Sequence, residues 1–230
     1  MAYKHLFFDL DHTIWDFDEN QIITLKQLFK RYELGNYFQN FDDFFEKYKP
    51  INKVLWQQFQ DREITQKEVK TGRFYHTFKI AGLDNIETAE AFGKDFMNEN
   101  SLREKVIPYT FELLDYLKQK RYHLYIITNG FKEAQYTKME KSGLSPYFKN
   151  IFISEDIGIS KPHRGFFEHS LTTVNARKSE SLVIGDSLCN DIMGAKNFGI
   201  DHVYFNPGQI PHSENVFKEI ASLKELIGWL

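Results

Sequence analysis

Short runs of consecutive apolar residues occur once near the start of the chain and repeatedly in its second half. Each run is three or four residues long and rich in Phe, Ile, Val or Leu, with no alternation of apolar and polar positions. Such runs are typical of strands covered on both faces in a parallel sheet. We therefore predict buried strands at Leu6–Phe8, Leu124–Ile127, Ile151–Ile153, Leu182–Ile184 and His202–Phe205.

Helical patterns lie between the later strands. Apolar residues within Phe111–Leu117 would share one helix face, and a helix from about Lys132 would end at Gly143. Apolar residues recur in the same way over residues 166–174. Strand and helix therefore alternate from about residue 105 to the end, which predicts an α/β fold with a Rossmann-like parallel sheet core.

Residues 16–102 break this alternation. Ile22, Leu25 and Phe29 recur at helical spacing, and no run in this region is typical of a strand. Further helical patterns occur at Phe41–Tyr48, Ile51–Phe59, Lys67–Ile80 and Glu87–Asn100.

This break predicts two domains. Residues 1–15 and 103–230 would form the α/β core domain, and residues 16–102 would form an all-helical domain inserted after the first strand. The segments Asp16–Glu19 and Asn100–Glu104 would be its hinges.

Composition and charge exclude several classes of protein. Of the 230 residues, 42% are hydrophobic and 27% are charged, which excludes a disordered chain. The formal net charge is −3, from 29 basic and 32 acidic residues, and this balance argues against a nucleic-acid polymer as partner. The sequence has no stretch of 18 apolar residues, so no membrane-spanning helix is predicted. We expect a monomer or a homodimer.

The N-terminal segment and the cysteine content indicate the compartment. Acidic residues at Asp9 and Asp11 come too early for the apolar core of a secretion signal. The single cysteine, Cys189, cannot form an internal disulfide, and we expect it to be a small buried residue at a helix start. A cytoplasmic location is expected.

Polar residues follow four of the predicted strands. Because the carboxyl ends of parallel strands meet at one edge of a sheet, these residues should converge on one crevice. Only the fold would bring them together, since they are far apart in sequence. They are Asp9 and Asp11, Thr128 and Asn129, Lys161, and Asp186 and Asp191.

A single aspartate after a strand is equally well explained as a helix cap or a turn former. Four acids at one edge are different, because they would repel one another without a cation. Carboxylate oxygens suit Mg²⁺, which is commonly held by one or two carboxylates and a substrate phosphate. Lys161, Thr128 and Asn129 would then bind the phosphate oxygens.

Four segments carry these residues: Phe8-Asp9-Leu10-Asp11-His12-Thr13, Ile127-Thr128-Asn129-Gly130, Ser160-Lys161-Pro162, and Gly185-Asp186-Ser187 through Asp191. They resemble, in the same order, the four signature motifs of the haloacid dehalogenase superfamily. This resemblance implies an HAD-like core, and the helical insert resembles the superfamily's cap of the first type. One departure is His12, where many relatives carry glycine.

A second resemblance is narrower. The insert contains Asn52-Lys53-Val54-Leu55-Trp56 and Gly72-Arg73-Phe74, and the core contains Ile127–Phe131 and Ile153-Ser154-Glu155-Asp156-Ile157-Gly158 through Pro162. They resemble the pyrimidine-type 5′-nucleotidase branch of the superfamily. The resemblance implies a small phosphate ester as substrate, with a nucleoside 5′-monophosphate as the expected one.

The superfamily resemblance implies roles for the acids. Asp9 would attack phosphorus and form an aspartyl-phosphate, and Asp11 would act as general acid and then as general base. Mg²⁺ would be held by the Asp9 and Asp186 carboxylates and the Asp11 backbone carbonyl. Asp191 would be a supporting ligand or an outer partner. Dehalogenases lack the second aspartate, so Asp11 favours phosphate ester hydrolysis.

The remaining roles concern phosphate and substrate. Thr128, Asn129 and Lys161 would bind phosphate oxygens. Substrate-binding candidates in and beside the insert are Trp15, Lys53, Trp56 and Arg73, although core packing or a solvated helix face explains each equally well.

Other functions stay open on the sequence. A sugar-phosphate or phosphoglycolate phosphatase and a phosphomutase would carry the same motifs. A non-catalytic module that binds a phosphate ligand is the alternative outside enzymes. It would be expected to lack at least one of Asp9, Asp11, Lys161 or Asp186.

Overall fold

A computed structural model of the chain describes residues 3–230, which divide into two compact units. We call one the sheet unit; it comprises the chain up to Asp18 together with Glu104–Leu230. The other, Glu19–Arg103, is the helical unit. Both boundaries fall inside the segments that were expected to be hinges.

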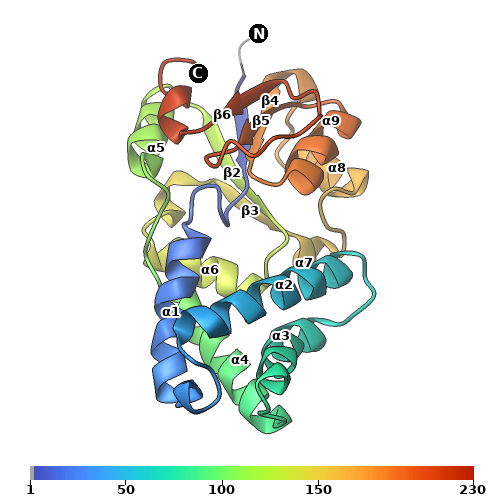
Figure 1. Cartoon of the computed structure of the whole chain (residues 1–230). Helices are drawn as coiled ribbons and strands as arrows, with labels where there is room; N and C mark the ends of the chain where they lie inside the picture. Colours follow the sequence, from blue (N-terminus) through green and yellow to red (C-terminus); the bar gives the residue numbers. More distant parts are fainter. Residues whose placement is uncertain (1–2) are drawn as a thin grey trace. The chain divides into compact units, whose positions relative to one another are not determined.

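The sheet unit is built on six parallel strands in the order β3-β2-β1-β4-β5-β6 (Figure 1). The five strands predicted from the apolar runs are confirmed, each one or two residues longer than expected. The sixth was missed because it is a three-residue edge strand with one buried apolar residue. The strands are β1 (His5–Phe8), β2 (His123–Thr128), β3 (Asn150–Ile153), β4 (Ser181–Gly185), β5 (Asp201–Phe205) and β6 (Lys218–Ile220).

The pleat of each strand divides its apolar side chains between two cores. In β1, Leu6 and Phe8 pack into one core and Phe7 packs into the other. Helix α5 (Thr110–Gln119) contributes to the first core and α8 (Arg164–Thr173) to the second. Because both faces of the sheet are covered, the strands appear in the sequence as continuous apolar runs.

Short elements complete the sheet unit. Helix α6 (Lys132–Lys141) lies between β2 and β3 in the chain, and α9 (Gly194–Phe198) precedes β5. The other elements are η2 (Ser145–Tyr147), α7 (Ser154–Ile157), η3 (Lys178–Glu180), η4 (Leu188–Met193) and η5 (Leu223–Leu226).

The helical unit contains no strand among its residues, all of which the structure describes. The expectation of two separate helices over residues 41–59 is wrong, because one helix runs through Pro50. Asn40 caps this helix, and Thr65 and Asn85 cap the next two. The elements are α1 (Phe17–Arg31), which begins in the sheet unit, η1 (Leu34–Asn36), α2 (Phe41–Gln60), α3 (Gln66–Ile80) and α4 (Ile86–Ser101).

Aromatic side chains fill the core of the helical unit. Phe44 on α2 lies edge-on to Phe38 and Phe92, with ring centroids 5.3 and 6.3 Å away. Edge-to-face pairs of this kind add to the free energy gained from burial. Much of the chain's aromatic content therefore serves packing. Among the described residues, no helix has the length and apolarity needed to span a membrane.

Gly185 ends β4 at the point where the chain turns into η4. A methyl group on Gly185 would overlap the carboxylate of Asp191, which is completely buried. Asp191 cannot swing away easily, because its Oδ2 accepts from the backbone N–H of Ser187 at 3.0 Å. A glycine is therefore required here by close approach of a side chain.

We predict that Gly185→Ala lowers the free energy of unfolding by about 1–3 kcal/mol, as expected for overpacking of a dense core. Urea denaturation measures this change. Gly208→Ala is the matched control, because a methyl group there meets only Ile210 at an ordinary 3.4 Å. Equal stability of both variants would contradict the close packing of Gly185 on Asp191.

Candidate active site

A buried lysine joins the ends of neighbouring strands. The Nζ of Lys161 donates to Asp9 Oδ1 at 2.6 Å, to Asp191 Oδ1 at 2.6 Å and to the Ile127 carbonyl at 2.9 Å. All three ammonium protons are used, and the side chain is only 2% exposed. Lys161 thus physically connects the ends of β1, β2 and β4, which were expected to converge.

The electrostatics of this group are strongly perturbed. Burial disfavours the Lys161 ammonium, but the charges of Asp191 and Asp9 outweigh burial and raise the pKa of Lys161. Burial also raises the pKa of Asp9. Lys161 opposes that rise, but the charges of Asp191 and Asp186 add to it, so the pKa of Asp9 lies well above its usual range.

Thr13 connects the loop after β1 to the loop after β4. Its Oγ1 lies 3.0 Å from Asp186 Oδ1 and 3.3 Å from Asp9 Oδ2, and it accepts from the Asp186 backbone N–H at 3.1 Å. The hydroxyl holds two carboxylates in fixed orientation. Thr13 thereby ties the loop after Asp9 to the chain that follows β4.

Asp9, Asp186 and Asp191 form an acidic cluster. Each offers an oxygen, and these oxygens all lie within 4.8 Å of one another. Burial raises the pKa of Asp186 to about 6, with His12 opposing the rise and Asp191 adding to it. Lys161 supplies only one positive charge against three carboxylates. The donor set therefore fits a hard divalent cation such as Mg²⁺, which prefers oxygen ligands.

Asn129 and Thr128 follow β2. The Asn129 side chain bonds the backbone of Lys161 at both ends, accepting from its N–H at 2.9 Å and donating to its carbonyl at 2.8 Å. Asn129 therefore positions Lys161, using its Oδ1 and one of its two amide hydrogens. Thr128 Oγ1 accepts from the Gly130 backbone N–H at 3.1 Å.

Asp11 has two partners that the sequence analysis missed. Its Oδ1 accepts from Lys138 Nζ at 2.5 Å and its Oδ2 accepts from Gln135 Nε2 at 2.9 Å. Burial raises the pKa of Asp11, but the charge of Lys138 and the two hydrogen bonds outweigh burial and lower it. The sequence does contain one indication of these partners. Gln135 and Lys138 are three residues apart, and therefore on one face of the helix that follows β2.

His12, the departure from the family motif, has left-handed backbone with φ of 64°. Its Nδ1 lies 3.4 Å from an Asp18 carboxylate oxygen. Burial disfavours the charged ring, but the Asp18 hydrogen bond and the charges of Asp186, Asp18 and Asp11 raise the pKa of His12 to about 9. A cation therefore stands beside the acidic cluster.

Two of the four substrate-binding candidates are core residues. Trp15 is completely buried, and the Lys138 ammonium lies 4.4 Å from its ring centroid. Arg73 is 1% exposed, with its guanidinium 4.9 Å from the rings of both Phe74 and Phe96. Burial leaves neither side chain a free surface for substrate, so we do not retain them as candidates. For Arg73 the alternative of a solvated face is wrong too.

Lys53 and Trp56 lie near the end of α2. Lys53 is exposed and Trp56 is half-buried against Phe59, with ring centroids 5.8 Å apart. The expectation that Cys189 is buried is wrong, because the residue is exposed within η4.

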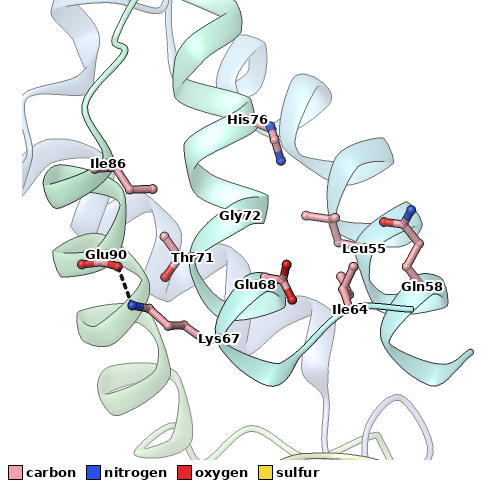
Figure 2. Close-up of a pocket in the computed structure, with 10 residues that line it drawn as sticks. All are labelled: Leu55, Gln58, Ile64, Lys67, Glu68, Thr71, Gly72, His76, Ile86 and Glu90. Atoms are coloured by element: carbon pink, nitrogen blue, oxygen red, sulfur yellow. Dashed lines mark ion pairs between the residues drawn. The ribbon is translucent and has the colours of Figure 1, made fainter. Parts of the chain in front are cut away.

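A pocket of about 370 Å³ opens within the helical unit (Figure 2). Leu55, Ile64 and Ile86 form apolar walls, and Lys67 pairs with Glu90 at 3.2 Å across part of the rim. The pocket holds no cluster of acids and no buried charge. The ionisable residues of its lining, Lys67, Glu68, His76 and Glu90, are all exposed.

Comparisons with known proteins agree with this geometry. The profile of the family described as "Haloacid dehalogenase-like hydrolase" matches residues 6–205. The chain is 32% identical to the HAD-hydrolase YfnB of Bacillus subtilis in a magnesium-bound crystal structure. That match has a TM-score of 0.89 and covers 100% of this chain and 99% of that one.

Two further relatives are named for phosphatase activities. Pyrimidine 5′-nucleotidase PynA of Streptococcus pneumoniae is 35% identical over 94% of this chain and 87% of its own. A glyceraldehyde 3-phosphate phosphatase of Pyrococcus furiosus is 28% identical over 95% and 87%. With its parallel sheet, its linked motifs and a profile match over most of its length, the chain belongs to the haloacid dehalogenase-like hydrolase family.

Proposed function

We propose that this protein is a Mg²⁺-dependent phosphatase that hydrolyses small phosphomonoesters through an aspartyl-phosphate on Asp9. The substrate class that we propose is a nucleoside 5′-monophosphate. The proposal rests on two carboxylates, Asp9 and Asp11, that come from one loop and have separate lysine partners.

The observation that carries the proposal is the second carboxylate. Halide departs without a proton, so displacement of halide needs only a nucleophile such as Asp9. An alcohol is a poor leaving group unless it is protonated, and Asp11 is a carboxyl group placed two residues away, with its own hydrogen-bonded partners. Two acids with different surroundings suit a reaction that needs a nucleophile and a proton carrier.

In the first step, an Asp9 oxygen forms a bond to phosphorus while the bond from phosphorus to the ester oxygen breaks. Asp11 gives its proton to that departing oxygen. Lys161 stays on Asp9 Oδ1, and Oδ2 is the attacking atom, with the Thr13 hydroxyl 3.3 Å away. Lys161 and the Thr128 hydroxyl balance charge that develops on the transferring group.

In the second step, water attacks the phosphorus of the aspartyl-phosphate and Asp11 takes a proton from that water. Inorganic phosphate leaves and the Asp9 carboxylate is restored. The contacts of Asp11 described above favour its ionised form, which is the form required in this step. The first step requires the same carboxyl in its protonated form.

The acidic cluster fits a magnesium ion. Asp9, Asp186 and the backbone carbonyl of Asp11 would hold it, with Asp191 as the supporting residue. When bound, Mg²⁺ would offset the negative charge of the phosphate and of the carboxylates around it. Thr13 keeps Asp9 and Asp186 oriented for this purpose.

The choice of a nucleotide rests on the named activity of PynA and on the resemblance to the pyrimidine 5′-nucleotidase branch. A sugar-phosphate phosphatase is the second candidate, because the Pyrococcus furiosus relative is named for glyceraldehyde 3-phosphate. The catalytic residues are the same for both. The leaving group must therefore be distinguished outside the acidic cluster.

We propose the helical unit as the cap that selects the leaving group, with Lys53 and Trp56 as its contacts. Lys53 is exposed, and Trp56 keeps part of its ring open to solvent. A ring can stack on a base, and an ammonium can bond a base carbonyl or a sugar hydroxyl. Closure of such a cap excludes water from the reacting centre.

We predict Mg²⁺-dependent release of phosphate that is fastest with pyrimidine nucleoside 5′-monophosphates. The measurement is a phosphate assay over nucleotides, sugar phosphates and phosphoglycolate, with and without chelator. Asp9→Asn keeps the shape of the side chain but removes the nucleophile, so it should abolish release from every substrate.

Three outcomes would correct this proposal. Activity confined to sugar phosphates would keep the chemistry and replace the substrate class. Conversion of a sugar phosphate to its isomer without phosphate release would indicate a phosphomutase. Full activity of Asp9→Asn, or activity unaffected by the chelator, would refute the mechanism.

Substitution of the proposed cap contacts should change selectivity. We predict that Trp56→Ala and Lys53→Ala lower kcat/KM for the preferred nucleotide by about tenfold each, the size of one lost stacking or hydrogen-bond contact. Hydrolysis of p-nitrophenyl phosphate should change little. Val54→Ala, at the exposed neighbouring position, is the control. Equal losses on both substrates would indicate a structural role instead.

A further inference from the structure

Two polar side chains on α6 are buried beside the site, and no role has been given to them. Gln135 is completely buried and Lys138 is 5% exposed. Their spacing places both on one face of the helix. Buried polar groups on a helix face that could hold apolar residues cost free energy unless their contacts compensate.

Lys138 is fixed from two directions. Its ammonium lies 4.4 Å from the Trp15 ring centroid and 5.3 Å from that of Phe17, within reach of cation–π attraction. The same Nζ donates to Asp11 Oδ1 at 2.5 Å. The aromatic rings therefore hold the ammonium where it meets Asp11.

Gln135 connects two site residues. Its Nε2 donates to Asp11 Oδ2 at 2.9 Å and to Thr128 Oγ1 at 2.6 Å. The carboxylate settles the orientation of the amide, because only the NH₂ group can donate to it. A methyl group on Gly130 would overlap Gln135 Nε2, so the glycine of this motif leaves room for the amide.

The contacts of Thr128 direct its proton. Its Oγ1 accepts from Gln135 Nε2 and from the Gly130 backbone N–H at 3.1 Å. With both acceptor positions used, the hydroxyl hydrogen must point to another acceptor. A phosphate oxygen is the acceptor that this site would supply.

We propose that Lys138 and Gln135 are positioning residues for the phosphatase reaction: together they orient the Asp11 carboxyl toward the leaving oxygen, and Gln135 aligns Thr128 as a donor to phosphate. This inference rests on the proposed function. It adds a second lysine to the site, with a task distinct from that of Lys161. Lys161 serves the nucleophile and Lys138 serves the acid–base residue.

The test compares two leaving groups. Uridine 5′-monophosphate releases an alcohol that needs a proton, whereas 2,4-dinitrophenyl phosphate releases a phenolate that needs none. Lys138→Met keeps chain length and the packing against Trp15 but removes the bond to Asp11. We expect kcat for uridine 5′-monophosphate to fall by about 100-fold or more, the scale of general acid–base catalysis.

The first-turnover burst of dinitrophenolate, which precedes the shared step in which Asp11 activates water, should lose only a few-fold in rate, and KM for both substrates should stay within a few-fold. Lys138→Arg retains a cation and should restore much of the lost rate. Lys141→Met removes an exposed lysine from the same helix and should have no effect. A merely structural role of Lys138 would lower both activities equally.

Gln135→Leu keeps the proposal testable if Lys138→Met does not fold, and melting temperatures of all variants report folding. We expect Gln135→Leu to show the same dependence on the leaving group, with an added rise in KM because Thr128 is no longer aligned. Equal losses on both esters, or unchanged kcat on uridine 5′-monophosphate, would overturn the inference.

Failure of the inference differs from failure of the proposed function. If the wild-type protein hydrolyses both esters and the variants lose both equally, the phosphatase stands and the positioning role is refuted. If the wild-type protein releases phosphate from neither ester, the proposed function is refuted and the inference is refuted with it.

Discussion

The arrangement of the site depends on one buried ammonium group. Lys161 pairs with two carboxylates, Asp9 after β1 and Asp191 on η4 after β4, and it also binds the carbonyl of Ile127 on β2. Removing one partner of a buried ion pair generally costs about 3–5 kcal/mol, because the other charge is left uncompensated. The parallel register of β1, β2 and β4 brings these groups to one edge, and Lys161 makes their proximity tolerable.

A second lysine creates a division between the two aspartates of the first motif. Burial and the charges of Asp191 and Asp186 raise the pKa of Asp9, whereas Lys138 and Gln135 lower the pKa of Asp11. The separation here arises from elements far apart in sequence, with Lys161 before α8 and Lys138 on α6.

The sequence predicted the parts of this molecule whose signal is local. Apolar runs located five strands, and the residues that follow them are joined by hydrogen bonds as the topology requires. Burial of Arg73 between aromatic rings depends on contacts between separate helices, which no single pattern encodes. For the same reason Lys138 went unnoticed, because a lysine on a helix is ordinarily a solvated residue. The apolar pattern predicted separate helical segments at Phe41–Tyr48 and Ile51–Phe59, yet α2 runs through both.

The central claim is that Asp9 carries the phosphoryl group during turnover. The most direct measurement is to quench the protein during hydrolysis, reduce it with borohydride and locate the modified residue by mass spectrometry. Borohydride converts an aspartyl-phosphate to homoserine, so the account predicts homoserine at position 9 and at no other aspartate. Steady turnover without modification, or homoserine at Asp11 or Asp186, would contradict it.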